Sequence, residues 1–229
     1  MRLSGATARR IVRWIESTDN AGARLGKGYQ GEIYLYQSDE EHYVVKVALG
    51  RGPLRVLRTR MLRNEFAAYQ RLEGFAGSPC CFGLLDGKYL VLEYVDAESI
   101  RSARIADAET FFHRLFCFIA EMHERGVAHA DLKRKDNLMV VNGTRPCIID
   151  FGIAIIRKDG FAPLNHALFK LARQFDRNAW IKLKYRKRMA EISAEDRIYY
   201  HRTFIETLLR ETKRIYKRLK KRLFCSGRR

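Results

Sequence analysis

The sequence predicts an α+β fold in which a lobe built on an antiparallel β-sheet is followed by a reduced, mainly helical lobe. Runs rich in β-branched and aromatic residues fill much of residues 1–95, whereas helical periodicity dominates residues 96–229. The chain has too few alternating strand and helix units for a doubly wound parallel sheet. With 229 residues, 47% of them apolar, it can bury one full-sized core, so we expect a single domain over residues 1–229.

The elements of the first lobe follow from periodicity and turn residues. Apolar residues at helical spacing predict a short amphipathic helix over residues 6–17. Glycines and an acidic turn separate three β-forming runs, and Pro53 opens a helix that extends to about Glu73. We expect strands over residues 24–26, 32–37, 42–48, 77–87 and 88–95.

In the second lobe, Asp107 is placed to cap a helix that runs through Arg125 and ends at Gly126. Two short strands over residues 138–141 and 147–149 flank a tight turn. Everything after about His166 is predicted to be helical, with a break near residues 192–194.

The positive charge is concentrated at the end of the chain. The net charge is +18, and residues 153–229 hold 22 Lys and Arg against 7 Asp and Glu. Such a surplus favours a polyanionic partner: nucleic acid, an anionic membrane surface or a phosphorylated substrate.

The sequence carries no signal for export or for crossing a membrane. Its longest apolar run, residues 80–85, is far shorter than the ~18 residues of a transmembrane helix, and the N-terminus lacks an apolar secretory block. Five cysteines without CxxC spacing are typical of buried thiols in a reduced compartment. We therefore expect a cytoplasmic protein.

A glycine-rich run and a lysine in a strand are the first candidates for chemistry. Gly26, Gly28 and Gly31 are followed by a strand rather than a helix, which excludes a dinucleotide-binding domain and is compatible with a hairpin folded over phosphates. Lys46 interrupts the apolar run YVVKVAL, so it lies either on a solvated face or in a cleft. In a cleft, Glu65 on the next helix would be its counter-ion.

Two aspartates form the second set of candidates. Asp131 lies in the polar loop of GVAHADLKRKDNLMV, together with His129, Lys133 and Asn137. Asp150 leaves the hydrophobic strand of CIIDFG beside a glycine, where a carboxylate is suited to holding a metal. A hairpin joins the two segments, so both carboxylates can converge on one point.

Taken in order, these motifs resemble the protein-kinase-like fold. The resemblance covers about residues 25–152, from the glycine-rich loop through VVK, LEYV and HADLK to DFG. It implies two lobes (residues 1–95 and 96–229) and transfer of a phosphoryl group from ATP with Mg²⁺ as cofactor.

The resemblance also implies a role for each candidate residue. Asp131 would orient or deprotonate the attacking hydroxyl, Lys133 would contact the γ-phosphoryl group, and Asp150 would bind Mg²⁺. The residues implied in ATP binding are Gly26, Gly28, Gly31, Ile33, Lys46, Glu65, Glu93 through its carbonyl, and Val95 through its amide.

Three departures narrow the family. Asp136 stands where the second metal ligand is usual and Asn137 follows it, so either residue can serve; the amide favours Asn137. Ala130 replaces the arginine that receives an activation-loop phosphate, and no APE-like motif follows Gly152. The pattern is therefore most similar to RIO-type kinases and to bacterial lipopolysaccharide core heptose and Kdo kinases.

The basic end of the chain bears on the acceptor. Residues 203–224 carry apolar residues at helical spacing among many cations, as a helix on anionic headgroups would. We expect a kinase of a lipopolysaccharide inner-core sugar, peripheral on the inner face of the cytoplasmic membrane. A RIO-type protein kinase bound to ribosomal RNA would explain the same charge. A pseudokinase scaffold is a third possibility, weakened by the presence of Lys46, Asp131 and Asp150 together.

Overall fold

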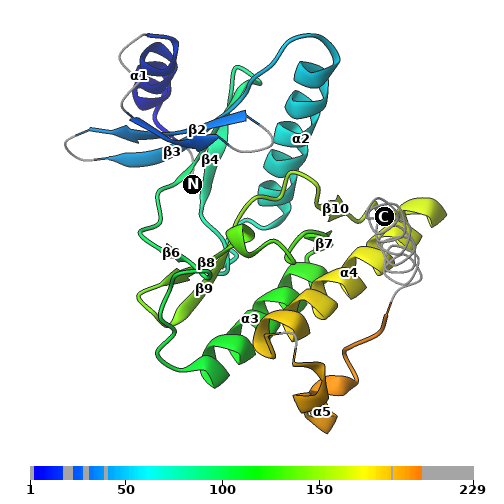
Figure 1. Cartoon of the computed structure of the whole chain (residues 1–229). Helices are drawn as coiled ribbons and strands as arrows, with labels where there is room; N and C mark the ends of the chain where they lie inside the picture. Colours follow the sequence, from blue (N-terminus) through cyan, green and yellow to red (C-terminus); the bar gives the residue numbers. More distant parts are fainter. Residues whose placement is uncertain (1–2, 18–22, 28–30, 39–40, 187, 203–229) are drawn as a thin grey trace, which may run out of the picture.

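The fold is taken from a computed structural model of the chain (Figure 1). The structure describes residues 3–17, 23–27, 31–38, 41–186 and 188–202. Gly28 and the predicted basic helix at residues 203–224 lie outside these ranges.

The first part of the chain forms a five-stranded antiparallel sheet flanked by two helices (Figure 1). The strands stand in the order β1-β2-β3-β5-β4, so the fourth and fifth are exchanged in space. These elements are α1 (Gly5–Glu16), β1 (Arg24–Lys27), β2 (Gly31–Gln37), β3 (His42–Ala48), α2 (Gly52–Arg71), β4 (Cys81–Leu85) and β5 (Tyr89–Glu93).

The second part is mainly helical and carries two small antiparallel sheets. β7 pairs with β10, while β6, β8 and β9 form a three-stranded sheet. The elements are β6 (Glu98–Ser99), α3 (Ala108–Glu124), β7 (Val127–Ala128), β8 (Leu138–Val141), β9 (Arg145–Ile148), β10 (Ile155–Ile156), α4 (Pro163–Lys184) and α5 (Ala194–Arg197), with single 3-10 turns at Lys135–Asn137 and Met189–Glu191.

Alternation along the strands decides which side chains meet the helices. In β5, Leu90 and Leu92 join the main core with α2, whereas Tyr89 and Val91 pack with Ile11 of α1 on the other face. The main core continues through α3, β8, β9 and α4 and holds the chain together from residue 62 to residue 181. Lys46 is opposite Leu90 in the β3–β5 register, which places it on the α2 side of the sheet.

Most predicted elements are present, with differences at their limits. Asp107 caps α3 by accepting the Thr110 N–H at 3.1 Å, and the positive φ of Gly126 ends that segment as expected. β9 begins at Arg145 rather than at residue 147. The prediction of helix from about His166 onward is confirmed over α4, which begins at Pro163, but is wrong beyond it, because α4 ends at Lys184 and residues 198–202 are not helical.

In the described ranges, no helix combines the length and the hydrophobicity that crossing a bilayer would require.

Candidate active site

The site is built around Lys46, which lies between two carboxylates. Its Nζ is 2.6 Å from Oε1 of Glu65 on α2 and 3.9 Å from Oδ1 of Asp150, which follows β9. The Lys46 side chain is 13% exposed and that of Glu65 is fully buried. Lys46 is therefore paired with Glu65 in the interior and does not lie on a solvated face of the sheet.

Each partner of the Lys46–Glu65 pair opposes the effect of burial on the pKa of the other. Burial alone would lower the pKa of Lys46, but attraction to Glu65 and then to Asp150 outweighs it, and the pKa lies above its ordinary value. Burial raises the pKa of Glu65, and the Lys46 ammonium opposes that effect. A fixed ammonium group beside an accessible carboxylate is thus available for a ligand.

The loop between β7 and β8 brings Asp131 to the same place. His129 donates from Nε2 to the carbonyl of Ile149 at 2.9 Å, and its Nδ1 accepts the Asp131 N–H at 3.3 Å. The Asn137 side chain donates to the Asp131 carbonyl, while its backbone carbonyl accepts the Ile149 N–H. The loop is therefore tied to the segment that carries Asp150.

Two residues of the site hold an uncommon backbone conformation. Ala130 and Asp150 have φ of 66° and 68°, in the left-handed region that costs non-glycine residues about 1–3 kcal/mol. Asp176 of α4, which is buried, accepts the N–H groups of His129 at 2.8 Å and Ala130 at 2.9 Å. Oδ2 of Asp176 also lies 2.9 Å from Nε2 of His123. Asp176 therefore holds the backbone at Ala130 in its uncommon conformation.

The Asp131 carboxylate is partly exposed and electrostatically tuned. Burial raises the pKa of Asp131; His129 and Arg134 lower it, and Asp150 raises it further. Arg134 is within ion-pair distance, with its Nε 3.9 Å from Oδ2 of Asp131. Lys133, two residues beyond Asp131, is exposed.

Asp136 and Asn137 point to different surroundings although they are adjacent in the chain. Asn137 is 3% exposed and hydrogen-bonds to Asp131. The Asp136 carboxylate is 52% exposed and takes a bidentate ion pair from Arg101, with distances of 2.6 and 3.1 Å. That ion pair lowers the pKa of Asp136.

The described residues that are predicted to bind the nucleotide from the sheet lie on or directly after its strands. Gly26 and Gly31 lie on the paired strands β1 and β2, and Ile33 is opposite Lys46. A Cβ on Gly31 would come within 1.8 Å of the Val47 carbonyl oxygen, so only glycine fits there. Glu93 ends β5 and its carboxylate accepts the Cys80 N–H, and Val95 is partly exposed in the segment that follows.

Sequence reasoning missed Asn64, which precedes Glu65 on α2. Its Nδ2 lies 3.4, 3.2 and 2.9 Å from the carbonyl oxygens of Phe151, Gly152 and Ala154. These contacts join the helix that carries Glu65 to the segment after Asp150. For Asn64, the only signal in the sequence was an amide side chain one position before Glu65. For Asp176, the other residue that was missed, the only signal was an acidic residue among the apolar residues of a predicted helix.

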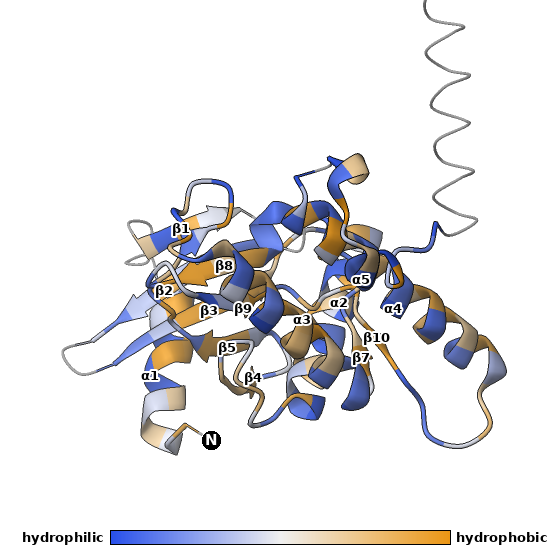
Figure 2. Ribbon diagram, turned by 90° about the horizontal axis from the view of Figure 1, so that it is seen from below, coloured by the Kyte–Doolittle hydropathy of each residue, from blue (hydrophilic) through white to orange (hydrophobic). Residues whose placement is uncertain are grey.

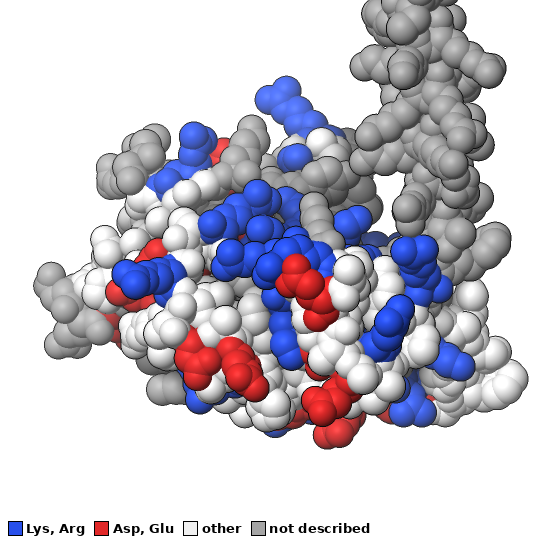
Figure 3. Space-filling model, turned by 60° about the horizontal axis from the view of Figure 1, so that its bottom comes forward, with Lys and Arg blue, Asp and Glu red and all other residues white. Residues whose placement is uncertain are grey.

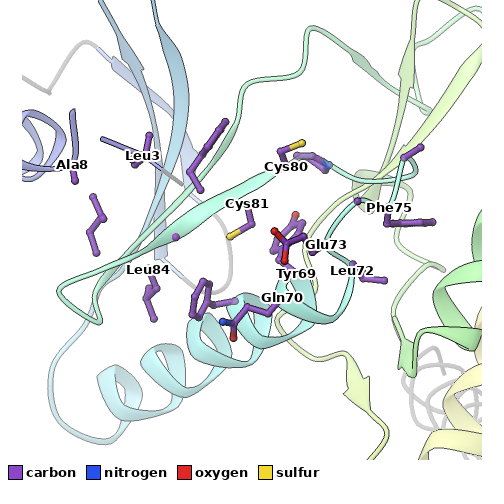
Figure 4. Close-up of a pocket in the computed structure, with 17 residues that line it drawn as sticks. Leu3, Ala8, Tyr69, Gln70, Leu72, Glu73, Phe75, Cys80, Cys81 and Leu84 are labelled. Carbon is purple, nitrogen blue, oxygen red and sulfur yellow. The ribbon is translucent and has the colours of Figure 1, made fainter. Parts of the chain in front are cut away.

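A cavity of about 620 Å³ lies elsewhere, between α2 and β4 (Figure 4). Tyr69, Phe75 and Cys81 are among the residues that line it. Neither Lys46, Asp131 nor Asp150 lines this cavity, so it is separate from the cluster described above.

The chain is similar in sequence to protein kinases. A scan against protein-family models finds no match. Among curated proteins, the probable cell division control protein 7 homolog 2 of Encephalitozoon cuniculi is 29% identical over 138 residues, 57% of this chain and 38% of that protein. Serine/threonine-protein kinase oca2 of Schizosaccharomyces pombe is 30% identical over 151 residues, 61% of this chain and 23% of that protein. PknD of Mycobacterium tuberculosis is 27% identical over 146 residues, 59% and 22% respectively.

These relatives include serine/threonine-protein kinases, and the α+β fold of the chain is compatible with a kinase-like fold. The matched segments span less than two fifths of the relatives' own lengths.

Proposed function

We propose that the protein is an ATP-dependent kinase that transfers a phosphoryl group to an alcohol. The observation that carries this proposal is the meeting of Lys46, Glu65 and Asp150 beside Asp131, four residues from four separate parts of the chain. Positioning and electrostatics dominate phosphoryl transfer, and this cluster offers both.

Each residue has a defined task in the proposed reaction. Lys46, held by Glu65, binds oxygens of the α- and β-phosphates, while Asp131 orients the acceptor hydroxyl and receives its proton. Lys133 contacts the γ-phosphoryl group. The backbone around Gly26 and Gly31, on the paired strands β1 and β2, covers the phosphates, and Ile33 lies against the nucleotide. The Glu93 carbonyl and the Val95 amide bind the adenine edge.

The residues present fit a magnesium ion. Asp150 offers a carboxylate and Asn137 an amide, and Mg²⁺ prefers such oxygen ligands together with waters and substrate phosphates. When bound, Mg²⁺ neutralises the phosphates. We assign the amide role to Asn137 because Asp136 is engaged by Arg101.

We propose a sugar hydroxyl of the lipopolysaccharide inner core (heptose or Kdo) as the acceptor, reached from the cytoplasmic face of the membrane. Only ten residues separate Gly152 from α4, which leaves little room for the peptide-docking segment that protein kinases carry there. The surplus of cations after residue 152 suits a phosphorylated lipid.

The second candidate acceptor is a serine or threonine side chain of a protein. In that case the chain would be a RIO-like protein kinase that binds RNA. The names of the relatives favour it, since PknD and oca2 are serine/threonine-protein kinases. Lysines and arginines that contact RNA phosphates would account for the charge equally well.

The mass of the lipopolysaccharide core separates the two candidates. Cells without the gene should lack one phosphate on the core, and the gene with Asp131→Asn should not restore it, because loss of a general base lowers transfer by about 10²- to 10⁴-fold. An unaltered core together with a ribosome-assembly defect would favour the protein acceptor. Absence of transfer by the unaltered protein to any acceptor would refute a kinase.

A further inference from the structure

The segment that follows Gly152 leaves four large apolar side chains in water. Ile153 is 45% exposed, Phe161 97%, Leu164 74% and Leu168 44%. Leu164 and Leu168 are one turn apart on α4 and share a face, and Phe161 immediately precedes that helix. Figure 2 shows the connection between β10 and α4 projecting from the body, with a hydrophobic tip.

Other residues of α4 account for the helix's own packing. Phe169 and Ala172 pack with Ala128 below β7 and β10, and Asp176 anchors the turn at Ala130. Phe161 and Leu164 are mostly exposed, and Leu168 is 44% exposed, so these side chains contribute little to the core. Leu164 and Leu168 are neighbours on the helix surface, and exposed apolar patches mark interaction sites.

Cations surround this apolar surface. In the part of the chain that the structure describes, no carboxylate is within ion-pair distance of Arg157, Lys158 or Lys170, and the nearby Asp159 carboxylate is held by Arg71 at 2.9 Å. Lys and Arg side chains also lie on other parts of the surface, most densely across the middle of one face of the molecule (Figure 3). The neighbourhood is thus both apolar and positive.

We propose that this surface, Ile153–Leu168, docks on an anionic phospholipid bilayer. Phe161, Leu164 and Leu168 enter the interfacial layer, and the surrounding Lys and Arg side chains lie at the phosphate level. Nucleic acid would use the cations but leave Phe161 in water. The proposal deepens the proposed function: Ile153 is three residues beyond Asp150, so a lipid-linked acceptor would be held next to the catalytic cluster.

Vesicle binding of the full chain tests the proposal. Co-sedimentation with vesicles of two parts phosphatidylcholine and one part phosphatidylglycerol is expected to fall about tenfold for Phe161→Ser, and less for Leu164→Ser. The matched control is Ile198→Ser, a residue that is 64% exposed beyond the other end of α4. Equal binding by all three variants, or no preference for anionic over pure phosphatidylcholine vesicles, overturns the docking surface. Residues 203–229 are present in every variant, so their contribution cancels.

A tryptophan reporter gives an independent measurement. With Phe161→Trp, emission should shift to the blue on anionic vesicles and be quenched by brominated lipid, whereas Ile198→Trp should not respond. An unshifted Phe161→Trp spectrum on vesicles that bind the protein contradicts the proposal. ATP binding measured without vesicles distinguishes the two claims, because Phe161→Ser should leave it unchanged even if docking is lost.

Discussion

At the scale of single residues, the site depends on contacts that cross from one element to another. Lys46 and Glu65 are 19 positions apart and meet at 2.6 Å, while Asn64 joins the same helix to carbonyls almost 90 positions further along. A residue beside the counter-ion thus controls how α2 lies against the segment of Asp150.

Replacing Asn64 tests that role. Asn64→Leu keeps the size but leaves carbonyl oxygens without their donor, so we expect a loss of about 1–2 kcal/mol in the free energy of unfolding and a raised KM for ATP. Chemical denaturation and steady-state kinetics measure the two effects. The control is Gln70→Leu, the same change at an exposed position of α2, which should alter neither. A KM equal to that of the unaltered protein would show that Asn64 only stabilises the fold.

The pH dependence of turnover reports on Asp131. Because burial raises its pKa, and the ionised carboxylate is the active form, kcat/KM should fall with falling pH at a higher pH than for an ordinary aspartate. Arg134 lowers this pKa, so Arg134→Gln should move the acid limb further up. Lys135→Gln removes the same charge nearby and should not move it. If the pH at which kcat/KM falls is the same in Arg134→Gln as in the unaltered protein, the acid limb does not report the ionisation of Asp131.

At the scale of elements, α4 supports the loop that carries Asp131. Asp176→Asn would set an amide against the N–H groups of His129 and Ala130, and its site has no access to water. We expect a loss of about 3–5 kcal/mol in the free energy of unfolding, measured in urea. Asp159→Asn, a fully comparable change at an exposed ion pair with Arg71, should cost well below 1 kcal/mol. Similar losses for both variants would mean that Asp176 does not anchor the loop.

The elements also show what a single sequence can predict. Long periodic segments such as α2 and α3 were predicted within a few residues, since a cap, a proline and an apolar stripe mark them. The strands β6, β7 and β10 were missed because two residues carry no alternation, and their pairing partners lie far away in the sequence. Trp180 lies in the most basic part of the chain, yet it is buried and donates to the Phe112 carbonyl.

The same limit applies to the site. Lys46, Glu65 and Asp150 could be predicted from motifs to lie together, and the structure brings them together. Asp176 could not, because its role depends on two backbone N–H groups whose orientation only the folded loop defines.

At the scale of the whole molecule, the main core governs the reactivity of the cysteines. Burial raises the pKa of Cys147 to about 12, and that of Cys81 to about 11, so neither forms a thiolate at neutral pH. Alkylation of the folded protein at pH 8, mapped by mass spectrometry, should modify the exposed Cys117 and spare Cys147. Unfolding in denaturant is the control, since it should make both equally reactive. Early modification of Cys147 would mean that the core opens.

The affinity for ATP with and without Mg²⁺ tests the central claim most directly, because it requires no acceptor. By calorimetry, the unaltered protein should bind Mg²⁺–ATP, and Asp150→Asn should weaken that binding by about tenfold or more while leaving metal-free binding little changed. Asp136→Asn, the same substitution at the carboxylate held by Arg101, should leave both affinities unchanged. Equal effects of the two substitutions, or no binding of ATP by the unaltered protein, would contradict the account.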